Sequence, residues 1–120
     1  MSTQKVADQW AQMCREGKYL ECVEVLYSEN VTSKEMPDAP DEEVVIGRQN
    51  VYDKSKQWLE TVLEFHGGNI SDPVVVGNHF TSIMSFDVTF KDRGRQQMEE
   101  ICVFEVGHGK IVFEQFFYTN

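Results

Sequence analysis

The sequence lacks any long hydrophobic run, and this absence excludes several classes of protein. No stretch approaches the ~18 apolar residues of a membrane span, and the first residues, MSTQKVADQW, lack the apolar segment of a secretion signal. Cysteine is also scarce: Cys14, Cys22 and Cys102 cannot all pair, and no two of them form a Cys-x-x-Cys motif. We therefore expect a cytoplasmic protein with reduced cysteines and no membrane partner.

Positive charge is scarce as well. Eleven lysines and arginines face 20 acidic residues, for a net charge of −9, and the basic residues are scattered. Nucleic acid is therefore not an expected partner, because phosphate binding needs clustered basic side chains. No phosphate-binding loop, nucleophile elbow or zinc-protease motif occurs, so we expect no cofactor.

The three histidines do not suggest a metal site. His66, Asp72 and His79 lie close together in the sequence. If a hairpin turn falls at Gly77-Asn78, an extended chain of about 3.3 Å per residue separates His66 from His79. His108 falls in a predicted turn. We predict no metal.

The residues that are present indicate one globular domain. At 120 residues, 41% of them apolar and 12% aromatic, the chain is long enough to bury a core. Helical spacing predicts a first helix up to Gly17, a second that begins at Tyr19 and ends at Asn30, and a third from Gly47 to the break at Gly67-Gly68. Short strands are expected at 31–36 and 44–46, on either side of an acidic loop at 37–43. The apolar stripe of the third helix comprises Val51, Ser55, Trp58, Leu59 and Val62.

The second half of the chain predicts antiparallel sheet. Runs at 74–76, 79–91, 98–106 and 111–118 are separated by glycine turns. Helices followed by long hairpins predict an α+β fold.

Alternation assigns the faces of these strands. Even-numbered residues from Phe80 to Phe90 and from Met98 to Val106 share an inner face. An odd-length loop at 93–95 then pairs Phe86 with Cys102, Met84 with Phe104 and Val88 with Glu100.

The closing hairpin extends this face. A two-residue turn at His108-Gly109 pairs Glu100 with Phe117 and Cys102 with Gln115. Glu100 and Gln115 then become diagonal neighbours on the inner face.

The opposite face is also apolar, and three helices cannot cover both sides of the sheet. We expect a homodimer through this outer face; the alternative is that bulges or the C-terminus cover it within one chain. The residues assigned to the interface are Ile83, Ile101, Val103, Val112, Phe116 and Tyr118.

The order of elements and the closing segment 100–118, EICVFEVGHGKIVFEQFFY, resemble the SnoaL-like domains of the nuclear transport factor 2-like superfamily, as does Ile46-Gly47-Arg48 before the third helix. The resemblance covers nearly the whole chain, so residues 1–120 are interpreted as a single SnoaL-like domain. It implies a cone in which a curved antiparallel sheet wraps around three N-terminal helices, a cystatin-like roll with a pocket at its open end.

The resemblance leaves the function open, because the family includes polyketide cyclases, ketosteroid isomerases, epoxide hydrolases and dehydratases as well as proteins without known activity. In the epoxide hydrolase branch of the family, the closing segment is similar to Trp-Arg-Asp-Tyr-Phe-Asp. Here the segment from Glu114 to Thr119 reads EQFFYT, and the missing acid argues against epoxide hydrolysis.

Glu100 is the leading candidate for chemistry. Among Phe86, Phe104 and Phe117, its carboxyl would be desolvated and its pKa raised, which suits proton transfer. Gln115 could donate a hydrogen bond to an enolate-like oxygen. The alternative is that a bulge shifts the register and Glu100 has only a structural role. Glu35 and Asp87 could add a second carboxylate, but both are interpreted as solvated.

Three functions remain open: binding of a small apolar organic molecule, cyclic ones included; cofactor-free isomerase, cyclase or dehydratase chemistry with Glu100 as acid and base; and a dimerisation module without ligand. The side chains expected to line the pocket are Trp10, Tyr19, Tyr27, Trp58, Phe80, Met84, Phe86, Met98, Cys102, Phe104 and Phe117.

Overall fold

The structure is a computed structural model that describes residues 1–36 and 44–119. The acidic loop expected at 37–43 lies outside these residues. Along the chain the elements are α1 (Thr3–Arg15), α2 (Tyr19–Leu26), β1 (Tyr27–Lys34), β2 (Val44–Ile46), α3 (Arg48–Glu60), β3 (Val62–Ile70), β4 (Val74–Val76), β5 (His79–Phe90), β6 (Gly94–Gly107) and β7 (Lys110–Tyr118).

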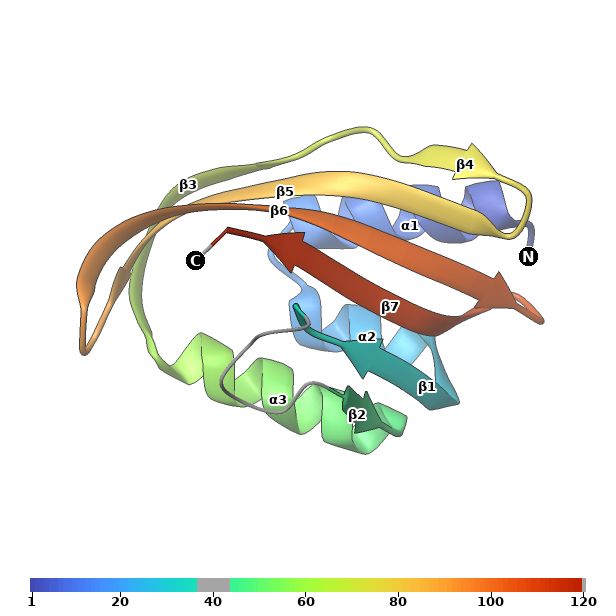
Figure 1. Cartoon of the computed structure of the whole chain (residues 1–120), viewed down its shortest axis with the longest axis horizontal. Helices are drawn as coiled ribbons and strands as arrows, with labels where there is room; N and C mark the ends of the chain where they lie inside the picture. Colours follow the sequence, from blue (N-terminus) through green and yellow to red (C-terminus); the bar gives the residue numbers. More distant parts are fainter. Residues whose placement is uncertain (37–43, 120) are drawn as a thin grey trace.

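The strands form one curved, unclosed sheet in the order β2-β1-β7-β6-β5-β3, with β4 paired to β5. In Figure 1 the sheet arches over the helices, and at one end β3, β5 and β6 bend down toward α3. The three helices and the curved sheet confirm the predicted α+β fold. The sheet is mixed, however, since β1 runs parallel to β7.

The core lies where α1 and α2 meet the concave side of the sheet. Trp10 of α1 packs against Phe80 and Phe104, with ring centroids 5.8 and 4.8 Å away, and those two rings stack at 4.5 Å. The periodic residues Val6, Trp10 and Cys14 are all buried, as an amphipathic first helix requires. None of the helices within 1–36 and 44–119 is long and apolar enough to cross a membrane.

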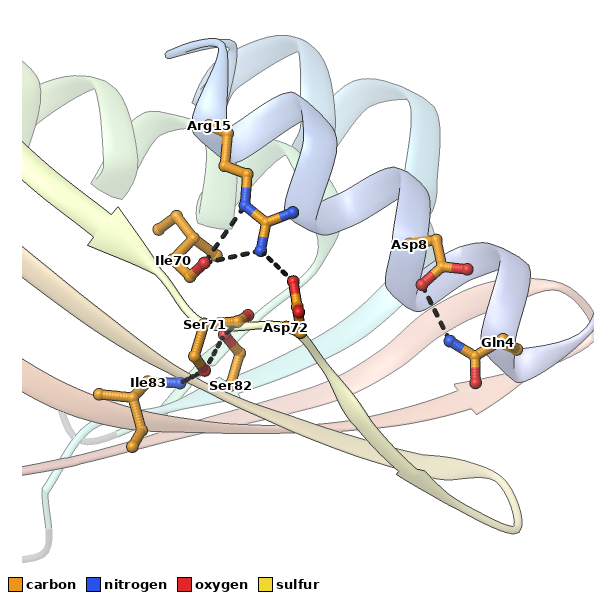
Figure 2. Close-up of polar contacts among 8 residues, drawn as sticks. All are labelled: Gln4, Asp8, Arg15, Ile70, Ser71, Asp72, Ser82 and Ile83. Carbon is orange, nitrogen blue, oxygen red and sulfur yellow. Dashed lines mark hydrogen bonds and ion pairs between the residues drawn. The ribbon is translucent and has the colours of Figure 1, made fainter.

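Polar contacts fix the break between β3 and β4 to the end of α1 (Figure 2). The guanidinium of Arg15 donates to the carbonyl of Ile70 at 2.8 and 3.2 Å and to Asp72 Oδ1 at 2.8 Å. Ser71 Oγ accepts from the backbone N–H of Ile83 at 2.8 Å, and Ser82 Oγ donates to the carbonyl of Ser71 at 2.8 Å. These bonds satisfy backbone groups where the strand pairing is interrupted.

The third helix is shorter than predicted. It ends at Glu60, where Thr61 Oγ1 donates to the carbonyl of Trp58 at 2.6 Å. The residues from Val62 to Ile70 form β3, which pairs antiparallel with β5. Sequence periodicity had assigned Val62 to the helix. These residues instead pair with the free edge of β5, and the hydrogen bonds between the two strands outweigh the weak helical pattern.

The predicted register of β5 and β6 was wrong by four residues. Phe86 pairs with Met98, and Met84 pairs with Glu100. The loop consists of residues 91–93, and Phe90 pairs with Gly94, whose φ of +76° is a conformation that glycine adopts without strain. Because the loop is still odd in length, even-numbered residues keep the inner face, and Glu100 stays there.

A β-bulge changes the end of the last strand. The two-residue turn at His108-Gly109 is confirmed, and Val106 pairs with Ile111 as expected. Glu105 then pairs with Phe113, so Val112 is an extra residue in β7. Every side chain beyond the bulge lies on the face opposite to the predicted one.

Candidate functional site

A cavity of about 1610 Å³ lies between α3, the other two helices and the concave face of the sheet. In Figure 1, α3 faces the underside of the arch formed by β3, β5 and β6. One stripe of α3 lines the cavity with Val51, Lys54, Ser55 and Trp58, at helical spacing i, i+3, i+4 and i+7. The sheet supplies the opposite wall.

One end of the cavity is aromatic. Trp58 lies 5.9 Å from both Phe86 and Phe90 between ring centroids, and Phe65 of β3 lies 6.3 Å from Trp58. Tyr19 of α2 approaches Phe86 at 6.3 Å, and burial raises the pKa of this tyrosine to about 12. These rings form one continuous aromatic cluster beside the cavity.

Most of the residues predicted to line the pocket do line this cavity. Phe80 and Cys102 are instead part of the closed core. Phe117 is on the outer face of the sheet, 39% exposed, so its assignment to the pocket was wrong. The predicted residues that line the cavity are Trp10, Tyr19, Tyr27, Trp58, Met84, Phe86, Met98 and Phe104.

Glu100 lines the cavity from the middle of β6. It pairs with Met84 on one side and with Tyr118 on the other, and Cys102 Sγ contacts its Oε1 at 3.8 Å. Burial raises the pKa of Glu100 to about 7, and the nearby Glu35 and Glu114 contribute to the increase. The same burial raises the pKa of the Cys102 thiol.

The bulge brings a second carboxyl, Glu114, to the inner face. Its side chain is 4% exposed and accepts hydrogen bonds from the hydroxyl of Tyr27 and from Ser33 Oγ, the latter at 2.7 Å. Burial raises the pKa of Glu114, although the two hydrogen bonds act in the opposite direction. Burial and the neighbouring carboxylate also raise the pKa of Tyr27.

Gln115 does not take the place predicted for it. It pairs with Val103 on the outer face, whereas its neighbours Glu114 and Phe116 line the cavity. The bulge at Val112 is the physical reason, since one additional residue reverses the alternation. The assignment of Gln115 as a hydrogen-bond donor beside Glu100 is therefore wrong.

A half-buried ion pair joins Glu35, which directly follows β1, to Lys54 of α3. Lys54 Nζ lies 2.6 Å from Glu35 Oε1, and the hydroxyl of Tyr118 donates to Glu35 Oε2 at 3.0 Å. Burial raises the pKa of Tyr118 to about 12, and so does the charge of Glu35. Lys54, Glu35, Tyr118 and Glu100 all line the same cavity.

Metal-binding geometry is absent from the described part of the chain, where no group of three or more His, Cys, Asp or Glu side chains converges. His66 bonds Thr89 Oγ1 at 2.6 Å, and His79 lies 3.5 Å from Glu105. Asp87, expected on the outside, forms a bidentate pair with Arg95 that lowers its pKa.

Sequence reasoning missed Lys54 and Glu114. Lys54 was recognisable, because it lies three residues after Val51 and four before Trp58, on the apolar face of the helix. Glu114 was not recognisable, because its direction depends on the bulge. Glu35 had been interpreted as solvated, but its side chain is only 20% exposed.

A family model for the SnoaL-like domain matches residues 1–118. A candidate SnoaL-like polyketide cyclase from Mesorhizobium loti is 31% identical, with 98% of this chain and 100% of that chain covered and a TM-score of 0.91.

More distant structures share the fold alone. A Xanthomonas campestris protein of unknown function with a cystatin-like fold is 15% identical (100% and 92% covered, TM-score 0.83). A nuclear transport factor 2-like protein of unknown function from Burkholderia pseudomallei is 11% identical (99% and 92% covered, TM-score 0.79). None of the curated proteins matches. The match over 1–118 and the Mesorhizobium relative show that this chain belongs to the SnoaL-like domain family.

Proposed function

We propose that the chain binds a small, largely apolar cyclic molecule in the cavity and that Glu100 transfers a proton on it in a cofactor-free isomerisation, cyclisation or dehydration. The observation that supports this most is the position of Glu100, a carboxyl on the wall of a cavity of about 1610 Å³ otherwise rich in aromatic side chains. The Mesorhizobium relative, named as a candidate cyclase, is consistent with it.

The chemistry follows from the environment of the carboxyl. With a pKa raised to about 7, Glu100 exists in both forms near neutral pH and can accept and return a proton. As a carboxylate it would take a proton from the carbon next to a carbonyl group. The C–H bond breaks, its electron pair moves into the enolate, and the carboxylic acid then returns the proton to the same or another carbon.

The test needs no knowledge of the natural substrate. The probe is 2-tetralone in deuterated water, and hydrogen–deuterium exchange beside its carbonyl is followed by NMR. We expect the protein to accelerate exchange and Glu100→Gln to reduce the acceleration at least ~100-fold, the usual scale of general-base catalysis. The control is Glu21→Gln, because Glu21 is exposed on α2, does not line the cavity and should exchange at the unaltered rate.

Two outcomes would contradict the catalytic proposal. One is that Glu100→Gln exchanges deuterium as fast as the unaltered protein. The other is that 2-tetralone binds, as seen by calorimetry, without any acceleration. The cavity would then favour the second candidate function, binding without chemistry, because its volume and aromatic wall do not depend on Glu100.

We also propose that two copies pair through the outer face of the sheet. Ile83 and Ile101 face each other on β5 and β6, and Phe117 of β7 pairs with Ile101. Phe116 and Tyr118, expected in this interface, lie on the cavity side because of the bulge.

A further inference from the structure

Lys54 lines the same cavity as Glu35 and Glu100, and Arg93 is the other cationic side chain among its described lining residues. The side chain of Lys54 comes from the buried stripe of α3, and about a third of it is exposed, but the Nζ atom itself is buried. An ammonium group buried in this way needs both a counter-charge and hydrogen-bond acceptors.

The counter-charge is present, but the acceptors are not. Glu35 Oε1 lies 2.6 Å from Nζ, as an ion pair without hydrogen-bond geometry, and among residues 1–36 and 44–119 no other acceptor bonds Nζ. Glu35 is itself held by the hydroxyl of Tyr118, at 3.0 Å. Glu35 therefore occupies one side of the ammonium, and the remaining N–H donors have no hydrogen-bond partner among the described residues.

Lys54 is connected to Glu100 through Glu35 and Tyr118. Tyr118, which holds Glu35, is the direct cross-strand partner of Glu100. The charge of Lys54 acts on Glu100, where it lowers the pKa of the carboxyl against the larger effect of burial. A cation on α3 and a carboxyl on β6 thus lie on opposite walls of one cavity.

We propose that Lys54 is a catalytic residue that donates to the carbonyl oxygen of the substrate and stabilises the enolate, which makes enolisable cyclic ketones the substrate class. This inference rests on the proposed function of Glu100 and deepens it. The carbonyl oxygen lies toward α3 and its acidic carbon toward β6. As Glu100 removes the proton, the electron pair of the C–H bond ends on the oxygen beside Nζ. Glu35 is a positioning residue that holds Lys54 through the contact at 2.6 Å.

Stabilisation of a developing oxyanion by a fixed donor in a site from which water is excluded is one of the largest effects in enzyme catalysis. Aromatic walls alone would accept hydrocarbons and ketones equally. An ammonium with unsatisfied N–H donors discriminates between them, because a ligand without oxygen leaves those donors unsatisfied.

The experiment compares ligands with the same ring system. The probes are naphthalene and 2-naphthol, an aromatic analogue of the enol of 2-tetralone. Calorimetry gives their affinities for the unaltered protein and for Lys54→Met, and absorption gives the pH at which bound 2-naphthol ionises. We expect Lys54→Met to weaken 2-naphthol binding at least tenfold, to leave naphthalene unchanged, and to raise the ionisation pH of the bound naphthol. Exchange of 2-tetralone should fall in parallel.

Matched variants separate charge from folding. Lys56→Met removes an exposed lysine from the same helix and should behave as the unaltered protein. Lys54→Met leaves the Glu35 carboxylate without its cation. The double variant Glu35→Gln/Lys54→Met therefore removes the Lys54 ammonium together with the carboxylate that it would leave unpaired. Thermal unfolding checks that each variant is folded. If Lys54→Met does not fold, the double variant is used for the binding measurements.

The outcomes distinguish the two proposals. If neither probe binds the unaltered protein, the ligand pocket is wrong and this inference falls with it. If both bind but the preference for 2-naphthol and its ionisation pH are the same without Lys54, the inference alone is wrong and the role of Glu100 stands. If only 2-naphthol loses affinity, Lys54 holds the oxygen.

Discussion

At the scale of single residues, the environment of Glu100 lowers the stability of the fold when this carboxyl is charged. Burial is the main cause of its raised pKa, and two further carboxyls, Glu35 and Glu114, act in the same direction. Lys54 and the Cys102 thiol only partly offset them. A carboxyl that lowers stability in this way is typical of a site under functional constraint.

The pH dependence of stability should reveal this cost. The folded protein holds the proton of Glu100 up to about pH 7, whereas an unfolded chain releases it near 4.5, so raising the pH between these values destabilises the fold. At 1.36 kcal/mol per pKa unit the loss is on the order of 3 kcal/mol by pH 8. Chemical denaturation at pH 5 and pH 8 measures it: we expect Glu100→Gln to lose that much less than the unaltered protein.

The control is again Glu21→Gln, whose loss between pH 5 and pH 8 should match that of the unaltered protein. Parallel losses in Glu100→Gln and the unaltered protein would show that Glu100 has an ordinary pKa. In that case it could not serve as the proton shuttle at neutral pH.

How far the site could be predicted differs from residue to residue. Glu100 was predictable because any odd loop between β5 and β6 keeps even residues on one face, even though the exact pairing was wrong. Gln115 was not, because one extra residue in β7 reverses its direction. Local sequence specifies alternation well but does not specify where a bulge interrupts it.

At the scale of elements, β3 supplies Phe65 to the aromatic cluster beside the cavity. It pairs along β5 with irregular register near Phe65, which faces the aromatic cluster around Trp58. The two glycines of this strand, Gly67 and Gly68, were interpreted from sequence as a helix break. In the structure only one of them is needed for close packing.

We predict opposite effects for alanine at these two positions. A Cβ atom on Gly68 would lie 2.6 Å from the backbone carbonyl oxygen of Ser85, whereas a Cβ on Gly67 would meet nothing within 4 Å. Gly68→Ala should therefore lower the free energy of unfolding by about 1–3 kcal/mol, the usual cost of overpacking. Gly67→Ala should leave it unchanged or raise it by up to about 1 kcal/mol through reduced freedom of the unfolded chain. Urea denaturation of both variants is the measurement, and equal effects would contradict the close approach of β3 to β5.

At the scale of the whole molecule, the curved sheet has one face committed to the cavity and the core and one face open. The helices all lie on the concave side (Figure 1). The resemblance to SnoaL-like domains made the cone predictable. The parallel pairing of β1 with β7 was not predictable, since it joins segments about 80 residues apart and no local pattern encodes it.

The open face carries an apolar row across its three central strands. Ile83, Ile101 and Phe117 are 45%, 48% and 39% exposed, and they lie side by side on β5, β6 and β7. Glu99 and Glu105, on the same face of β6, border the row. An apolar centre with a charged rim is the usual composition of a protein interface.

A charge in this row should separate the proposed dimer. We expect the unaltered protein to sediment as a dimer in analytical ultracentrifugation, and Ile101→Glu to sediment as a monomer at the same concentration, because a glutamate there would be buried without a partner. Val25→Glu is the matched control, since Val25 is 46% exposed on α2, away from the sheet, and should leave the dimer intact. An unaltered protein that is monomeric well above micromolar concentration would contradict the proposal, and so would a dimer that persists in Ile101→Glu. Because Glu100 faces the opposite side, both variants should keep their deuterium exchange activity, which separates assembly from chemistry.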